Sequence, residues 1–122
     1  MLAYVTVGVA DLGRARKFYD ALFEEMGAAV MMDMERLLVY GTSAGGAMFS
    51  ICTPHNGGPP SAGNGNMVAI APGSKELVDQ LHARALALGG TNEGDPGPRG
   101  DGFYGAYFRD LDGNKLCFCQ LG

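Results

Sequence analysis

The feature that most restricts the fold of this chain is a pattern that occurs twice. The first copy starts with Ala3–Val9, where side chains alternate as in a half-buried strand, and Asp11 then precedes an amphipathic stretch over Leu12–Met26. The second copy starts with the alternating stretch Asn66–Ala71, and Ser74 precedes its helical stretch. Such a recurrence after about 60 residues indicates a duplicated supersecondary unit.

Each copy continues with strand patterns. The first predicts three short strands at Ala28–Met32, Arg36–Tyr40 and Ala47–Thr53. The second predicts a weak strand at Gly90–Glu93, a glycine- and proline-rich loop at Gly94–Gly102, and a C-terminal hairpin over Phe103–Gln120 with a turn at Asp110–Asn114. Both copies are therefore read as β-α-β-β-β.

These patterns predict one α+β domain of 122 residues built from two βαβββ modules. Module 1 covers about residues 1–56, a linker covers about 54–65, and module 2 covers about 66–122. We expect the helices outside and the sheets curved around a shared space. Residues that face away from the helices would line that space, including Tyr4, Thr6 and Met67.

Composition narrows the classes of partner. The formal net charge of −4 argues against a nucleic-acid surface, which needs a basic field. No apolar run approaches the roughly 20 residues that span a bilayer. No signal peptide is visible, and three cysteines fit free thiols in a reducing compartment. We therefore expect a cytoplasmic protein whose ligand is a small molecule.

Three motifs resemble those of the vicinal oxygen chelate superfamily, which contains glyoxalase I, extradiol dioxygenases and bleomycin-resistance proteins. They are Asp11-Leu12 before a helix with Phe18-Tyr19, the lead-in Gly63-Asn64-Gly65, and Arg109-Asp110-x-Asp112-Gly113-Asn114 before the last strand. The resemblance covers essentially the whole chain. It implies paired βαβββ modules that form a cup-shaped half-barrel, usually in a homodimer.

In the metal-using members of that superfamily, His and Glu side chains from the first, fourth, fifth and eighth strands hold one divalent ion. Carried onto this chain, the first, fifth and eighth positions are Tyr4, Met67 and Cys117, and the fourth is Phe49 or Ser50. A phenol and a thioether are unsuited to a hard divalent ion. The sequence therefore predicts that the usual metal site is lost or altered.

Other groups offer alternative chemistry. Cys117 and Cys119 share one face of a strand, and with Cys52 and His55 they could form a soft-metal site for Zn²⁺ or Cu⁺ if their strands are neighbours. The simpler interpretation is that these cysteines are buried as small apolar residues. His82 is expected to face solvent among polar helix positions.

The sequence thus predicts a protein that binds a small apolar or aromatic molecule in the cup without the usual divalent metal. The expected ligand-binding residues are Tyr4, Thr6, Ser50, Met67, Tyr104 and Cys117. The alternative is a glyoxalase-like lyase or dioxygenase-type enzyme with an altered site for Zn, Ni, Fe or Mn. Its acid–base groups would be residues such as Tyr4, His55 and Tyr104.

Overall fold

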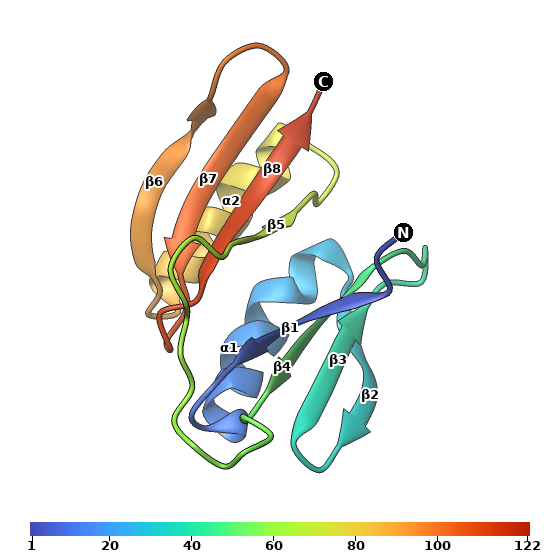
Figure 1. The fold of residues 1–122 in the computed structure, drawn as a ribbon. Coiled ribbons are helices and arrows are strands. Elements are labelled where there is room, and N and C mark those ends of the chain that lie inside the picture. The colour runs from blue at the N-terminus through green and yellow to red at the C-terminus, as the bar shows by residue number, and fades with distance from the viewer. The chain divides into compact units, whose positions relative to one another are not determined.

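A computed structural model describes all residues from 1 to 122 (Figure 1). The chain divides into two compact units, Met1–Ala62 and Gly63–Gly122. Each unit contains one helix and a four-stranded mixed sheet in the chain order strand, helix, three strands. The predicted α+β fold with two βαβββ modules is confirmed.

The first unit is a sheet of strand order β1-β4-β3-β2 in which only the β1–β4 pair is parallel. Its elements are β1 (Tyr4–Gly8), α1 (Leu12–Phe23), a 3₁₀ turn η1 (Glu24–Met26), β2 (Ala29–Met34), β3 (Leu37–Gly41) and β4 (Met48–Cys52).

The second unit repeats this topology with the strand order β5-β8-β7-β6, again with one parallel pair, β5–β8. Its elements are β5 (Val68–Ile70), α2 (Lys75–Ala87), β6 (Thr91–Pro98), β7 (Phe103–Arg109) and β8 (Lys115–Leu121).

Both helices start at the predicted caps. The Asp11 carboxylate accepts from the Arg14 amide at 3.0 Å, and the Ser74 hydroxyl oxygen accepts from the Leu77 amide at 3.1 Å. Each bond satisfies one of the amide donors that a helix start leaves without a partner. Gly27, with φ of 74°, follows the 3₁₀ turn in the left-handed region and ends the first helical segment.

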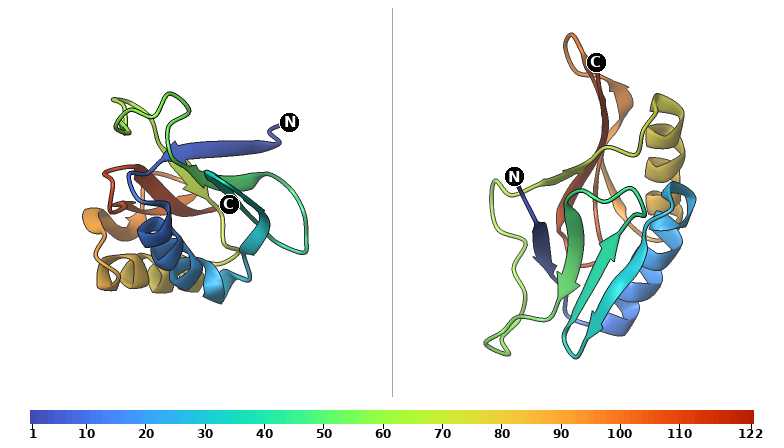
Figure 2. Two further views of the ribbon diagram at one scale, coloured as in Figure 1. Left: turned by 90° about the horizontal axis from the view of Figure 1, so that it is seen from below. Right: turned by 90° about the vertical axis from the view of Figure 1, so that its right-hand side faces the viewer.

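Each helix covers one face of the sheet in its own unit (Figure 2). In the first unit the rings of Tyr19 and Phe23 on α1 pack against Tyr40 and Phe49 on the sheet, with ring centroids 5.0–6.3 Å apart. In the second unit the buried helix residues are Val78, Leu81, His82 and Ala85. The opposite face of each sheet carries no helix of its own unit.

The long strand β6 corrects the prediction of a weak strand followed by a glycine- and proline-rich loop. The strand continues through Pro98 with two register shifts against β7. Proline and glycine are tolerated here because β6 is an edge strand, which leaves one side of its backbone unpaired. The loop composition was therefore a sign of an irregular edge.

His82 corrects a second prediction, because its side chain is buried with only 3% exposure. Its position lies four residues after Val78 and three before Ala85, so it belongs to the buried stripe of α2. Its Nε2 atom lies 3.2 Å from the Asn92 side-chain oxygen and 3.1 Å from the Tyr107 carbonyl oxygen. His82 thus ties α2 to β6 and β7.

The two helices span 12 and 13 residues, and neither is long and apolar enough to cross a membrane.

Candidate functional site

The helix-free face of the β1–β4 sheet is identified from contacts on the other side. Phe49 of β4 packs on Tyr19 of α1, and the Tyr40 hydroxyl of β3 donates to the Asp20 carboxylate at 2.7 Å. Side chains alternate along a strand, so the neighbours of Phe49 and Tyr40 point away from α1. Ser50, and not Phe49, therefore lies on the helix-free face. Of the two residues considered for the fourth-strand position, Ser50 is the one that occupies it.

This helix-free face is apolar and rich in thioethers. Its members follow from the strand register: Tyr4, Thr6, Met32, Met34, Leu37, Val39, Met48, Ser50 and Cys52. A side chain at Gly41 would meet Met31 and Met48 on the same face, so Met31 belongs to it as well. Tyr4, Met31, Met32 and Met34 are each exposed by 50–58%. Exposed thioethers are flexible, polarizable surfaces that adapt to apolar and aromatic partners.

Ser50 is the polar residue at the centre of that apolar face. It pairs with Thr6 across β1 and with Val39 across β3, and its side chain is completely buried. Its hydroxyl oxygen has no hydrogen-bond partner. A buried hydroxyl without a partner costs about 1–3 kcal/mol, so this atom is a place where a polar atom of a ligand would be stabilised.

The helix-free face of the β5–β8 sheet follows from Tyr104. Its hydroxyl donates to the Asp79 carboxylate of α2 at 2.6 Å, and the Lys75 ammonium lies 5.6 Å from its ring centre. Tyr104 therefore faces the helix, and not the helix-free face on which a ligand-binding residue of the cup was expected. Tyr107, three positions further along β7, points to the opposite face together with its cross-strand partner Cys117.

Cys117 is fully buried at the centre of that second helix-free face. Its thiol donates to the Phe118 carbonyl oxygen at 3.5 Å. Burial, and then the neighbouring Cys119, raise the pKa of the Cys117 thiol from 9.0 to about 11. In the metal-free protein Cys117 is therefore protonated near neutral pH and is a poor nucleophile.

The donor set at the superfamily's usual metal positions does not fit a hard divalent ion. It consists of the phenol of Tyr4, the hydroxyl of Ser50, the thioether of Met67 and the protonated thiol of Cys117. Divalent ions such as Mn²⁺, Fe²⁺ and Zn²⁺ are held by imidazole, carboxylate or thiolate ligands. Within either unit, no group of three or more His, Cys, Asp or Glu side chains gathers in an arrangement that could hold a metal.

His55, the other predicted acid–base residue, lies exposed beyond the end of β4. Its Nδ1 atom is 3.3 Å from a guanidinium nitrogen of Arg36, which also donates to the Thr53 carbonyl oxygen at 2.9 Å. Arginine is always a donor, so Nδ1 acts as the acceptor in this pair. The structure gives His55 a role in anchoring the chain after β4.

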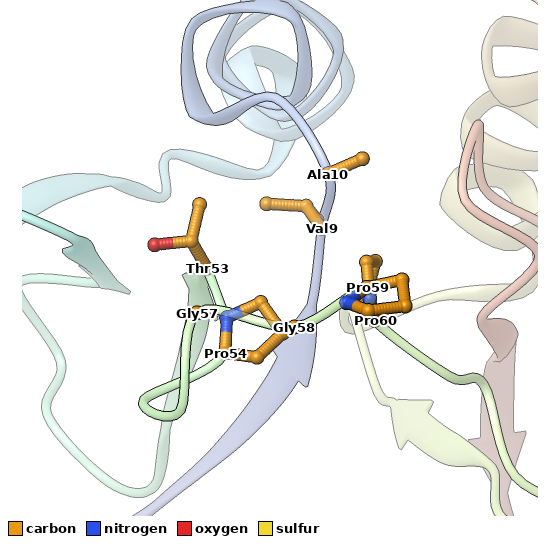
Figure 3. Close-up of a pocket in the computed structure, with 8 residues that line it drawn as sticks. All are labelled: Val9, Ala10, Thr53, Pro54, Gly57, Gly58, Pro59 and Pro60. Carbon is orange, nitrogen blue, oxygen red and sulfur yellow. The ribbon is translucent and has the colours of Figure 1, made fainter.

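A shallow hollow of about 470 Å³ lies where β1 and β4 end and the following linker turns back (Figure 3). Its lining residues are Val9, Ala10, Thr53, Pro54, Gly57, Gly58, Pro59 and Pro60. The Gly8 backbone packs closely here, because a Cβ atom added to Gly8 would lie 3.1 Å from Pro60 Cβ. With no titratable side chain in its lining, this hollow offers shape but no acid–base chemistry.

One cluster was missed as a unit in the sequence. Arg99 and Lys115 both lie over the ring of Tyr107, at 5.3 and 5.6 Å from its centre. The register that brings β6, β7 and β8 together creates this cluster, and no local motif marks it. The signal that could have found it is the alternation Lys115, Cys117, Cys119 opposite Tyr107.

Comparison with known proteins gives a consistent result over nearly the whole chain. The family model "Glyoxalase/Bleomycin resistance protein/Dioxygenase superfamily" matches residues 1–118. A glyoxalase/bleomycin resistance protein from Albidiferax ferrireducens is 42% identical, with a TM-score of 0.89 over 98% of this chain and 97% of that chain.

Two more distant structures share the fold. A glyoxalase/bleomycin resistance protein/dioxygenase family enzyme from Burkholderia phytofirmans is 19% identical, with a TM-score of 0.79 over 98% of both chains. A glyoxalase-related enzyme from Fulvimarina pelagi is 21% identical, with a TM-score of 0.77 over 98% of this chain and 86% of that chain. No functionally curated protein matches this chain.

Proposed function

This chain belongs to the glyoxalase/bleomycin resistance protein/dioxygenase superfamily, and from that premise we propose that it binds a small apolar or aromatic molecule. The observation that carries the proposal is the completely buried Ser50 hydroxyl, which has no partner at the centre of an apolar sheet face. A ligand that brings one hydrogen-bonding atom to Ser50 would remove the cost of the unsatisfied hydroxyl. Binding would then favour a molecule with one polar group on an apolar body.

The apolar part of the ligand would contact the methionines of the same face. Met31, Met32 and Met34 are half exposed, and Tyr4 adds an aromatic ring. Sulfur contacts with aromatic rings contribute about 0.3–1.5 kcal/mol each, and thioether side chains adjust to different shapes. This surface supports a preference for aromatic compounds over aliphatic ones of equal size.

We further propose that binding does not use the superfamily's usual divalent metal. Support comes from the donor chemistry at these positions, which are a phenol at Tyr4, a hydroxyl at Ser50, a thioether at Met67 and a thiol of raised pKa at Cys117. None of these groups is an imidazole or a carboxylate. The alternative is a lyase or dioxygenase-type enzyme with an altered metal site. The homodimer that the superfamily resemblance implies is a further expectation.

Replacing Ser50 by alanine tests the binding proposal through two opposite effects. We expect the free protein to gain about 1 kcal/mol in its free energy of unfolding, because an unsatisfied buried hydroxyl is removed. We expect the affinity for a bound aromatic compound to fall about five- to tenfold, because one hydrogen bond is lost. Denaturant unfolding and a thermal-shift screen with aromatic compounds measure the two effects.

The matched control is Ser43→Ala in the exposed turn before β4, which should change neither quantity measurably. A loss of stability in Ser50→Ala would mean that the hydroxyl already has a partner. An unchanged ligand affinity in Ser50→Ala would mean that Ser50 does not contact the ligand. Either result would contradict the role proposed for Ser50.

Metal analysis tests the second part of the proposal. Protein purified without chelators is expected to contain far less than one Zn, Ni, Fe or Mn ion per chain, and addition of these ions should leave the melting temperature unchanged. A ligand or metal that binds the native state at 100 times its Kd would stabilise it by about 2.7 kcal/mol. A stoichiometric metal content, or such a stabilisation, would favour the alternative of a metal-dependent enzyme.

A further inference from the structure

The cations Arg99 and Lys115 converge on one tyrosine of the helix-free face of the β5–β8 sheet. The Arg99 guanidinium carbon lies 5.3 Å and the Lys115 ammonium 5.6 Å from the ring centre of Tyr107. Arg99 follows β6 and Lys115 begins β8, so the two approach Tyr107 from the strands on either side of β7. We propose that this cluster binds an oxyanion, either a carboxylate or a phosphate group of a small molecule.

Arg99 is held in place without a carboxylate partner. Its Nη2 donates to the Asp95 carbonyl oxygen at 2.7 Å, and its Nη1 donates to the Pro98 carbonyl oxygen at 3.4 Å. A guanidinium has five N–H donors in a planar fork, so these two bonds leave donors for a ligand. Cation–π contact with Tyr107 orients the group without neutralising its charge. These contacts preorganise the guanidinium as a hydrogen-bond donor to an anion.

Two glycines of β6 make room for the guanidinium. A Cβ atom added to Gly94 would lie 3.3 Å from Arg99 Nη2 and 2.9 Å from a ring carbon of Tyr107. A Cβ atom added to Gly97 would lie 3.3 Å from Arg99 Nη1. Any larger residue at these positions would crowd Arg99 away from the sheet. The glycines that looked like loop residues in the sequence therefore shape the place where Arg99 lies.

The local charge of this cluster is opposite to that of the chain. Arg109, also on this face, is neutralised by Glu93 through an ion pair of 2.6 Å. Arg99 and Lys115 have no carboxylate within 4.0 Å. They leave a positive region on a protein whose formal net charge is −4. A localised positive field on an acidic protein attracts and holds small anions.

The groups around Tyr107 disfavour the ionised form of its phenol. Burial, and then the neighbouring Cys117, raise the pKa of Tyr107, while Arg99 acts in the opposite direction. Cys119 also faces the phenol and raises its pKa further. The Tyr107 hydroxyl interacts with the Cys117 thiol, so Lys115 and Arg99 are the groups that would donate to an oxyanion.

This inference is independent of the function proposed above, because it uses no residue of the β1–β4 sheet. It can fail while Ser50 binds an apolar compound, and it can hold if Ser50 does not. If both hold, the natural ligand carries an anionic group or the protein binds two molecules.

The test is a titration of the ¹⁵N-labelled full chain with benzoate, phenyl phosphate and the neutral analogue benzyl alcohol at constant ionic strength. The two anions distinguish carboxylate from phosphate. At least one anion should shift the amide signals of Gly94, Gly97 and Lys115 in a saturable way, and benzyl alcohol should not. Absence of saturable shifts with both anions, or equal shifts with benzyl alcohol, would overturn the proposal.

Variants assign the effect to the two cations. Arg99→Gln and Lys115→Gln should each weaken the responding anion about five- to tenfold, since each removes one charged donor. Arg99→Lys keeps the charge but loses the planar fork, and it should lie between Arg99→Gln and the unmodified chain. Lys17→Gln, on the exposed side of α1, should leave the affinity unchanged. Equal affinities in all variants would place the anion elsewhere and reject the site.

Discussion

Replacing Asp110 by alanine is expected to lower the free energy of unfolding by about 3–5 kcal/mol, because it removes a buried acceptor of several hydrogen bonds. One carboxylate oxygen accepts from the amides of Asp112 and Asn114, both at 2.9 Å, and the other accepts from the Asn114 side-chain amide at 3.0 Å. Asp110 is only 5% exposed, so water cannot fully replace these bonds.

The graded variant Asp110→Asn separates hydrogen bonding from charge. Its side-chain oxygen can still accept from the two backbone amides, but its NH₂ group faces the Asn114 NH₂ group, where two donors meet. We expect a loss of about 1–2 kcal/mol, between alanine and the unmodified chain. Asp101→Ala, in the exposed turn before β7, is the control and should cost less than about 0.5 kcal/mol.

Urea unfolding followed by circular dichroism measures these losses. The turn at Asp110 precedes β8, whose residue Cys117 pairs with both β5 and β7. If Asp110→Ala were as stable as Asp101→Ala, the turn would not hold the β7–β8 hairpin together. The register between β7 and β8 would then have to be fixed by the side chains of the strands alone.

The sequence is sufficient for the architecture because the fold depends on local and periodic signals. Alternation in Ala3–Val9, a cap at Asp11, and the recurrence of both near Asn66 and Ser74 each have a physical cause within a few residues. The helix-facing sides of β1 and β5 could also be predicted, since apolar alternation decides them. The alternation assigned Met67 to the side away from the helix. The register agrees, because Ala69, two residues after Met67, pairs with Cys117 on the helix-free face.

The errors lie where tertiary partners override local composition. Gly94–Gly102 has the composition of a loop, but β7 offers backbone partners as far as Pro98. His82 has polar neighbours in the sequence, but the helix turns it toward Asn92 and the Tyr107 carbonyl. Tyr104 follows a loop, so its face could not be predicted from the sequence. Its place in the alternation of β7 points it toward Asp79 of α2.

The sequence placed Tyr104 wrongly among the residues of the helix-free faces, and it could not predict the chemistry of the candidate site. Ser50 could be proposed only as one of two occupants of the fourth strand, because a missing hydrogen bond is a property of the packed structure. The Arg99, Tyr107 and Lys115 cluster joins residues of three strand regions and depends on their register. Such long-range contacts leave no periodic trace in a single sequence.

Stability is expected to fall as the pH rises through the range 9–11, and the buried thiol of Cys117 is one cause of this fall. Its thiol has its pKa raised from 9.0 to about 11, chiefly by burial. Between these values the unfolded chain releases the proton while the folded chain keeps it, so alkaline pH favours unfolding. The contribution is complete below about pH 9 and lost above about pH 11, a difference of about 2–3 kcal/mol.

The measurement compares urea unfolding of the unmodified chain and of Cys117→Ala at several pH values from 7 to 11. Alanine costs stability at every pH by leaving a small cavity, but it should remove most of the slope between pH 9 and 10.5. Tyr40 and Tyr107, whose pKa values are also raised, contribute at higher pH. Cys117 is one cause of the raised pKa of Tyr107, so the comparison relies on the slope at the lower end of this pH range. Cys52→Ala, at a half-exposed thiol, is the matched control and should keep the slope.

The sign of this slope also bears on metal binding at the position of Cys117. A bound cation requires a thiolate, so it would lower the pKa of Cys117 below its ordinary value and make stability rise with pH near neutrality. In the metal-free protein, burial raises the pKa of the Cys117 thiol to about 11, so stability without a metal should instead fall at alkaline pH. If Cys117→Ala left the alkaline slope unchanged, the buried thiol would not be the group that titrates in this pH range.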